Sequence, residues 1–459
     1  MGDKATWTGT LLMSLAKQVA AEKGLKDAVD LLIEYGADLN NIPQDTQGMV
    51  RTGRQGPLVG ACHNNDLDMA QFLLERGADP NIDNIDYGCP LSCAVNSAGN
   101  FQLVELLFDY GADIGLKQGI FEQAVFAGEK MISRLLQQPM TTEDRKRHLD
   151  QALQSAAYWA ILEMCIWLLD QGANPNYRGG RWGCPLTAAI ANNHIYDGAD
   201  INNRRLIIDL LLQRGADVNP GTIHAGPERN PNVEGDTFPT PLAAALQNQS
   251  MSIANRILEA GADPNIPGGE LHLPLQTAAC FCPAMVEPLL AAGSEVNAVS
   301  GATYGTALHA AAYAHNVDGI KLLLAHGADA TITAGKYGSV LQAEAKRETV
   351  SSGSRSGRRS VPAMKLLVAA GADVHAHCGK YGSVLQMAAK SGNLKAVQWL
   401  VEEMGVDVNV KGGRFGSVRA AAVMKEQWGV VSYLERKFGK FKWGGEEDKY
   451  GKWKGWVEE

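Results

Sequence analysis

The sequence predicts an all-α solenoid of stacked helix–turn–helix units, and three observations support this fold class. A Gly-Ala-Asp motif or a close variant recurs after leucine-rich stretches, as in FLLERGADPN at residues 72–81 and LLLQRGADVN at residues 210–219. Its glycines recur at steps of 32 or 34 residues, or at longer steps that contain insertions, at Gly36, Gly77, Gly111, Gly172, Gly215, Gly261, Gly293, Gly327, Gly371 and Gly405. A chain of 459 residues is too long for one ordinary domain, whereas in a repeat array each unit packs only on its neighbours.

One unit, at residues 304–329, shows why each part forms. Thr306 begins the first helix because its hydroxyl can cap the helix and link adjacent loops. Small residues at 310–312 let neighbouring helices approach closely, and the apolar residues at 320–324 form the buried stripe of the second helix. Gly327 ends that helix because the following residue usually needs a positive φ. An extended finger then leads to the next unit.

Several fingers carry an aromatic-Gly-Ser/Thr-x-Leu-Gln motif. It reads GKYGSVLQ at residues 335–342 and 379–386, with variants at 87–91, 182–186 and 304–309. By these motifs and the step of about 33 residues the chain resembles ankyrin-repeat proteins, in particular stand-alone fungal arrays, over roughly residues 20–435. The resemblance implies a concave recognition face of fingers and first helices, and it implies that His309 bonds to the backbone of a neighbouring repeat.

About eleven repeats are expected. The step of 61 residues between Gly111 and Gly172 leaves room for a degenerate helix pair at Phe121–Gln138, followed by a pair at Leu149–Asp170. We therefore assign residues 1–435 to the array and residues 436–459 to a tail or cap rich in Lys, Trp and Gly, with the last helix at Trp428–Phe438. Insertions are expected at residues 194–205, 220–239 and 347–362, the last two as mobile loops.

The charge of the chain is uneven. Its net charge is −8, but residues 321–459 carry 22 Lys and Arg against 14 Asp and Glu, which leaves −16 for residues 1–320. This asymmetry suggests an oriented partner surface, and compositional drift of a solvated surface is the alternative. The acidic body argues against direct nucleic-acid binding, and no apolar run reaches the about 20 residues that span a membrane.

Candidate chemical sites are few. His375, His377 and Cys378 are the best metal candidate, although polar decoration of a finger explains them better. The cysteine pairs 280/282 and 89/93 are expected to be buried or half-buried thiols, and the cysteines as a whole suit reduced thiols of a cytosolic or nuclear protein. Because phosphate-loop, zinc-protease and nucleophile-elbow motifs are missing from the sequence, we expect no catalytic residues, no metal and no cofactor.

The fingers are the predicted binding site. One position recurs directly before the finger aromatic and should form a row that turns from acidic to basic along the chain: Asp86, Arg181, Thr303, Lys336, Lys380 and Arg414. Trp182 is included in the candidate binding row, although the aromatics are expected mainly to pack between fingers. We expect the basic end of the row to engage an acidic peptide or protein surface.

The predicted function is a non-enzymatic scaffold or adaptor for protein–protein interaction. The resemblance extends this to a regulatory protein, such as a transcription co-regulator that acts through a DNA-binding partner. The alternatives are an enzyme with a convergent active site in the concave face, and the recognition array of a larger signalling protein. We expect a monomer in the cytoplasm, the nucleus or both, without membrane association.

Overall fold

The computed structural model describes two compact units, residues 1–216 and 217–459, which are treated separately below. The described residues are 25–36, 38–40, 56–82, 88–96, 100–115, 119–179, 182–191, 198–221, 223–224, 237–238, 240–268, 273–301, 303–346, 360–439, 444–447 and 453–457. The side chains of residues 198–201, 223–224, 237–238, 360, 444–447 and 453–457 lie outside this description.

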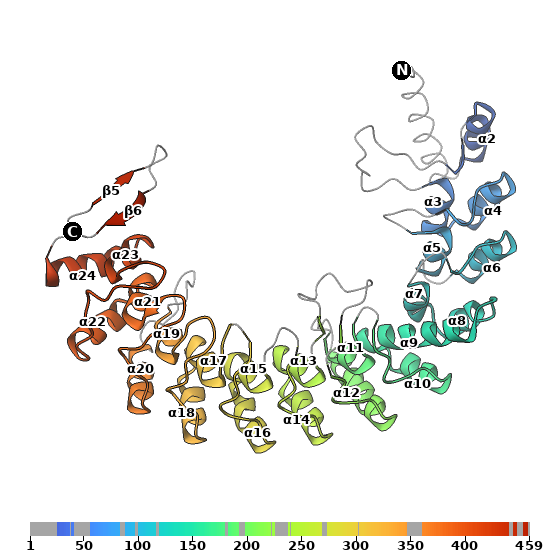
Figure 1. Cartoon of the computed structure of the whole chain (residues 1–459). Coiled ribbons are helices and arrows are strands. Elements are labelled where there is room, and N and C mark those ends of the chain that lie inside the picture. Colours follow the sequence, from blue (N-terminus) through green and yellow to red (C-terminus); the bar gives the residue numbers. More distant parts are fainter. Residues whose placement is uncertain are drawn as a thin grey trace. The chain divides into compact units, whose positions relative to one another are not determined.

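The first unit stacks two rows of helices, and neighbours within a row contact one another (Figure 1). Its first helices are α3 (Pro57–His63), α5 (Pro90–Asn96), α7 (Ile120–Ala127), α9 (Thr142–Tyr158) and α11 (Pro185–Ala191). Its second helices are α2 (Lys26–Glu34), α4 (Leu67–Glu75), α6 (Phe101–Asp109), α8 (Glu129–Leu135), α10 (Leu162–Asp170) and α12 (Gly198–Gln213).

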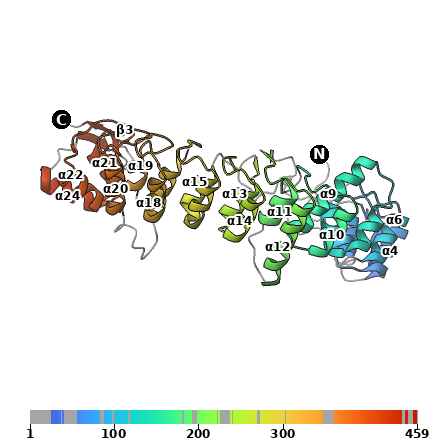
Figure 2. The ribbon, with the colours of Figure 1, turned by 90° about the horizontal axis from the view of Figure 1, so that it is seen from below.

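The second unit repeats this arrangement, with the first helices in one row and the second helices in another (Figures 1 and 2). Its first helices are α13 (Pro241–Gln247), α15 (Pro274–Phe281), α17 (Ala307–Tyr313), α19 (Val340–Ala345), α21 (Val384–Lys390) and α23 (Val418–Val423). Its second helices are α14 (Met251–Glu259), α16 (Val286–Ala291) after the 3-10 helix η1 (Pro283–Met285), α18 (Val317–Ala325), α20 (Ser360–Ala369), α22 (Leu394–Glu402) and α24 (Trp428–Phe438).

Three short antiparallel strand pairs accompany the helices: β1 (Ile223–His224) with β2 (Thr237–Phe238), β3 (His377–Cys378) with β4 (Gly382–Ser383), and β5 (Gly444–Glu447) with β6 (Trp453–Val457). Among the described residues there are eleven complete helix pairs, preceded by α2. The all-α solenoid predicted from the sequence is therefore confirmed. The degenerate repeat is also found, because α7 and α8 are separated only by Gly128, whose φ is 92°.

The structure differs from the expected boundaries in four places. Helix α9 begins at Thr142 and not at Leu149, because the Thr141 hydroxyl accepts a hydrogen bond from the Asp144 amide at 3.0 Å and caps an additional length of helix. Helix α12 begins at Gly198, so most of the insertion 194–205 is helical. Strands β1 and β2 pair within the expected loop 220–239, and α24 continues to Phe438, beyond the array boundary assigned from the sequence.

Polar residues at the first helices explain why such short helices form. Thr306, Ser339, Ser383 and Ser417 each accept a hydrogen bond from the backbone amide three residues later, which satisfies a donor that the first turn leaves unpaired. The alanines that follow, such as Ala310–Ala312, are buried between neighbouring first helices. Capping and small side chains together allow helices of six or seven residues to stack closely.

The Asn that ends the Gly-Ala-Asp-x-Asn motif or its variant connects several repeats to the next one. The Asn297 amide nitrogen donates to the Gly327 carbonyl at 3.1 Å, and its oxygen accepts from the Asp329 amide at 2.8 Å. The same two bonds are made by Asn40, Asn81, Asn219 and Asn265. The motif therefore ties successive turns together as well as ending each helix.

Replacing Asn297 tests this connection. Asn297→Ala removes two hydrogen bonds between repeats, and we expect it to lower the free energy of unfolding by about 1–2 kcal/mol, measured by urea denaturation. Thr331→Ala is the matched control, because Thr331 bonds only to Asp329 of its own turn. Equal losses for the two variants would contradict a role between repeats.

Candidate protein-interaction surface

Glycine lets successive fingers of the second unit pack backbone to backbone. A Cβ atom built on Gly335, Gly379 or Gly413 would lie 2.5–2.8 Å from the backbone of the aromatic residue in the preceding finger. Each of these glycines also has a positive φ, between 63° and 68°. Both observations require glycine at the first position of the finger motif.

The Gln or His of the same motif forms hydrogen bonds to the backbone of the next finger. Gln342 donates from its amide nitrogen to the carbonyls of Cys378 and Gly382 at 3.1 and 2.7 Å. His309 lies 3.2 Å from the Gly338 carbonyl through Nε2, as the sequence resemblance implied. Burial lowers the pKa of His309 to about 4, so this residue is neutral and structural.

The finger aromatics pack on one another. The ring centroids of Tyr337 and Tyr381 are 6.1 Å apart, those of Tyr381 and Phe415 are 6.3 Å apart, and both pairs are stacked. In the first unit Trp182 stacks on Tyr158 at 4.7 Å and is only 5% exposed. The expected packing role of the aromatics is confirmed here, and little of the Trp182 side chain is left to touch a partner.

The structure brings the basic members of the predicted row together. Lys336, Lys380 and Arg414 are exposed at the tips of fingers in the second unit. The Lys336 amide donates to the Thr303 carbonyl at 3.2 Å, and the Arg414 amide donates to the Lys380 carbonyl at 3.1 Å. Equivalent residues of adjacent fingers are therefore hydrogen-bonded neighbours. Asp86 and Arg181 lie outside the described residues.

A second row, which sequence analysis missed, follows the carboxyl ends of the first helices. The position seven residues after the N-cap is Tyr313, Lys346 and Lys390 in successive repeats. The Lys346 amine lies 3.6 Å from the Tyr313 ring centroid, and the Lys390 amine lies 4.2 Å from the Tyr381 ring centroid. The spacing from the capping Ser is visible in the sequence and is the signal that would have found this row.

Charges in residues 317–346 and 360–425 are segregated by face. The fingers and first helices (332–346, 376–390 and 410–425) carry eight Lys and Arg and one acidic residue, the buried Glu344. The second helices and their turns (317–331, 360–375 and 394–409) carry three Lys and six Asp and Glu. The face formed by the former segments, called the inner face below, is thus strongly cationic.

Seven of the eight cations of the inner face form no ion pair with another described residue. Ion pairs of Lys321, Lys365 and Lys437 all involve second helices. Among the described residues, no ion pair involves Lys336, Lys346, Lys380, Lys390, Lys411, Arg414 or Lys425. A cationic surface without internal partners attracts anionic ligands and accelerates their association.

The first unit offers a different surface. Phe126 and Trp159, which lie at the carboxyl ends of α7 and α9, are 59% and 48% exposed, and their ring centroids are 5.5 Å apart. Trp159 also contacts Tyr158 edge-on at 5.2 Å. Exposed Trp and Tyr side chains that support one another are common anchors of protein interfaces.

The metal candidate lacks the geometry of a metal site, and the candidate cysteines are buried or half-buried as expected: Cys89, Cys93 and Cys282 are buried, Cys280 is partly exposed, and burial raises the pKa of the Cys282 thiol. His375 and His377 are exposed, and the His375 amide bonds to the Asp373 carboxylate of its own turn at 2.8 Å. Within the described residues, no group of three or more His, Cys, Asp or Glu could hold a metal ion. Burial raises the pKa of the Cys165 thiol to about 12 and that of Cys62 also, as for structural thiols.

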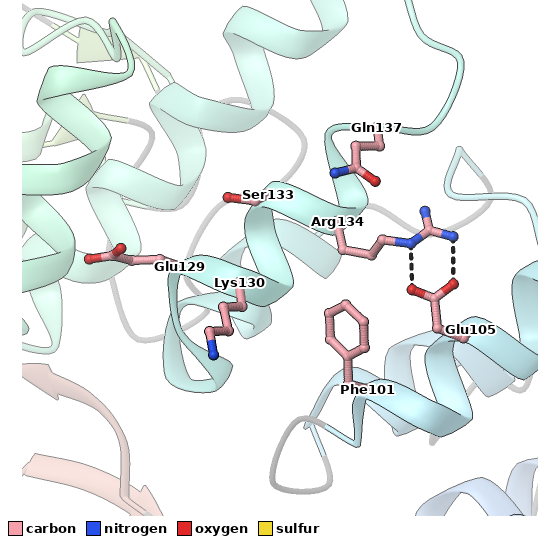
Figure 3. Close-up of a pocket in the computed structure, with 7 residues that line it drawn as sticks. All are labelled: Phe101, Glu105, Glu129, Lys130, Ser133, Arg134 and Gln137. Atoms are coloured by element: carbon pink, nitrogen blue, oxygen red, sulfur yellow. Dashed lines mark hydrogen bonds and ion pairs between the residues drawn. The ribbon is translucent and has the colours of Figure 1, made fainter.

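A shallow pocket of about 510 Å³ lies on the second helices α6 and α8 (Figure 3). Its main polar groups bind one another, since Arg134 donates to both carboxylate oxygens of Glu105 at 2.5 and 2.7 Å. This hydrogen bonding raises the pKa of Arg134. The pair joins two repeats, and the pocket does not lie among the fingers, where a convergent active site was considered.

In the described part of the chain, no helix is long and apolar enough to cross a membrane.

Comparison with known families agrees with this geometry. The family model described as ankyrin repeats (3 copies) matches residues 17–118 and 242–334, and the single ankyrin repeat model matches residues 380–410. The chain therefore contains ankyrin repeats over these residues.

Curated relatives share the repeats over part of their length. A B-cell lymphoma 3 protein homolog of Mus musculus is 38% identical over 102 residues, which cover 22% of this chain and 21% of that protein. The ankyrin repeat and KH domain-containing protein mask-1 of Caenorhabditis elegans is 30% identical over 252 residues, covering 54% and 8%. A putative ankyrin repeat protein of Rickettsia felis is 36% identical over 103 residues, covering 18% and 45%.

This chain thus spans less than half the length of each of these relatives. These relatives come from a mouse, a nematode and a bacterium, so they do not support the resemblance to fungal arrays in particular. The shared repeats support a role in protein–protein interaction.

Proposed function

We propose that this chain is a non-enzymatic adaptor whose second unit binds an acidic segment of a partner protein through the inner face. The observation that carries the proposal is the segregation of Lys and Arg onto the fingers and first helices of the last repeats, where Lys336, Lys380 and Arg414 form no ion pair with another described residue. Lys336, Lys380 and Arg414 make the first electrostatic contacts because they lie at the finger tips. The exposed aromatics of the first unit supply apolar contacts to the same or another protein.

The finer proposal is a regulatory role. An array that recruits proteins suits a transcription co-regulator that reaches DNA through a DNA-binding partner, in the nucleus or between cytoplasm and nucleus. The acidic net charge of −8 supports binding of protein and not of DNA. The alternative of a recognition array within a larger signalling protein uses the same inner face and differs only in what is attached to it.

Charge reversal tests the proposed binding face. A variant with Lys336→Glu, Lys380→Glu and Arg414→Glu replaces three attractions by repulsions, and we expect about tenfold or greater loss of affinity for a fluorescein-labelled poly-glutamate peptide. The salt dependence of binding should decrease as well, because fewer charge pairs form. Fluorescence anisotropy at several salt concentrations measures both effects.

The control has the same change in net charge and lies in the same or the adjoining repeats. Lys321→Glu, Lys365→Glu and Lys395→Glu alter three exposed lysines of the second helices. We expect this variant to bind the peptide within about twofold of the unaltered protein, since its charges lie on the other face. Equal losses for the two variants would show that only net charge matters and would remove the proposal.

A further inference from the structure

Three lysines from three successive repeats lie on neighbouring elements of the inner face. Lys390, at the end of α21, places its amine 4.2 Å from the Tyr381 ring centroid. Lys336 precedes Tyr337, whose ring stacks on that of Tyr381 at 6.1 Å, and Lys425 follows α23, which packs against α21. Partial burial lowers the pKa of Lys390; Tyr381 opposes this shift, and the charges of Lys425 and Lys336 add to it. The packing of the three repeats therefore gathers these like charges on one part of the inner face.

The described carboxylates on this face do not pair with the three lysines. Glu344, the buried acid of the inner face, is hydrogen-bonded to His315 at 3.0 Å. Glu426 is exposed next to Lys425, and no ion pair between them is present among the described residues. Within the described part of the chain these like charges thus lack a neutralising carboxylate, and a bound anion would stabilise them.

A phosphate monoester matches this arrangement better than a single carboxylate does. It carries about −1.5 to −2 charges and three strong acceptor oxygens, so it can bond to more than one ammonium group at once. Each Lys contributes three donors on a flexible stem, which suits an acceptor approached from several sides. A carboxylate has one charge and would leave most of the repulsion in place.

The aromatic residues beside the three lysines favour a protein ligand over a nucleic acid. Tyr337, Tyr381 and Phe415 are buried because they stack on one another. Their faces are therefore occupied and not open for the base stacking on which single-stranded nucleic-acid binding depends. A short phosphorylated segment does not require open ring faces, because the three ammonium groups provide its contacts.

We propose that Lys336, Lys390 and Lys425 form a binding site for the phosphate of a phosphoserine or phosphothreonine in the acidic segment of a partner protein. This inference rests on the proposed function, since it names what the inner face recognises. Phosphorylation of the partner would then control its recruitment by the array.

Three peptides of otherwise identical acidic sequence, with phosphoserine, Glu or Ser at the centre, test the proposal. Anisotropy with the full chain should show the phosphoserine peptide binding about tenfold more tightly than the Glu peptide. This preference should fall as the pH is lowered through about 6, where the phosphate takes up its second proton. The loss should occur without a comparable change for the Glu peptide.

Lys390→Met keeps an unbranched side chain over Tyr381 and removes the charge. It should abolish the preference for phosphoserine while the affinity for the Ser peptide changes less than twofold. Lys395→Met on α22 is the control and should leave the preference intact, because Lys395 is exposed on a second helix. Thermal denaturation of both variants verifies that they are folded.

The possible outcomes separate the two proposals. Equal binding of the phosphoserine and Glu peptides by the unaltered protein would overturn the phosphate site and leave the acidic-segment proposal standing. Failure of all three peptides to bind would contradict the proposed function itself. Displacement of the phosphoserine peptide by an equal concentration of single-stranded oligonucleotide would assign the cluster to nucleic acid and overturn the inference.

Discussion

Gly379→Ala should destabilise the second unit by about 2–5 kcal/mol. Two costs add at this position. The backbone has a φ of 66°, which strains any residue with a Cβ, and the Cβ itself would lie 2.6 Å from the Tyr337 carbonyl oxygen. Backbone atoms cannot turn aside as a flexible side chain can, so the two fingers must separate.

Urea denaturation of the full chain measures this loss in the transition of the second unit. Gly327→Ala is the matched control, because Gly327 has a φ of 85° but a Cβ there would meet no atom within 4 Å. The control should cost only the backbone strain, about 1–2 kcal/mol. If both variants lost the same stability, close packing of the fingers would not contribute.

Glu344→Gln should flatten the dependence of stability on pH. Glu344 is 0% exposed, one carboxylate oxygen lies 3.0 Å from Nδ1 of His315, and the other has no hydrogen-bond partner among the described residues. Burial raises the pKa of Glu344 to about 7 from an ordinary 4.5, although the bond to His315 opposes this rise. The folded state therefore holds the proton more tightly than the unfolded state does.

The sign of the effect follows from this shift. The stability conferred by the proton is complete below about pH 4.5 and is lost as the pH rises through about 7, a decrease on the order of 3 kcal/mol. Denaturation of the unaltered protein and of Glu344→Gln at pH values from 4.5 to 7.5 measures the difference. Parallel curves for the two proteins would show that Glu344 does not titrate in this range.

Much of the fold follows from local patterns. The Gly-Ala-Asp turns, the capping residues and the alanines predict the helix pairs, and Trp428–Phe438 is found with the bounds expected. The early start of α9 and the helical part of the insertion 194–205 were not anticipated, because a helix can extend into a polar segment wherever a cap is available. Helix boundaries depend on such local competition more than on the repeat pattern.

The candidate surface was predicted only in part. The finger motif identified Lys336, Lys380 and Arg414 as members of one row, because equivalent positions of a repeat array lie side by side. Lys390 and Lys425 were missed, since they lie at or just after the ends of first helices and come onto one face with Lys336 only when the repeats stack. Trp182 belongs to the finger motif, but its stacking on Tyr158 buries it.

The sequence by itself determined the class of this protein, because the turn, capping and alanine motifs that form each repeat lie close together in the chain and recur along it. Only the tertiary structure decided which charges share a face. Fingers and first helices are separated in the sequence by acidic second helices, and stacking the repeats places their cations together while turning the acids away. The cationic inner face is thus a property of the packed array, since it arises from contacts between residues more than 30 positions apart.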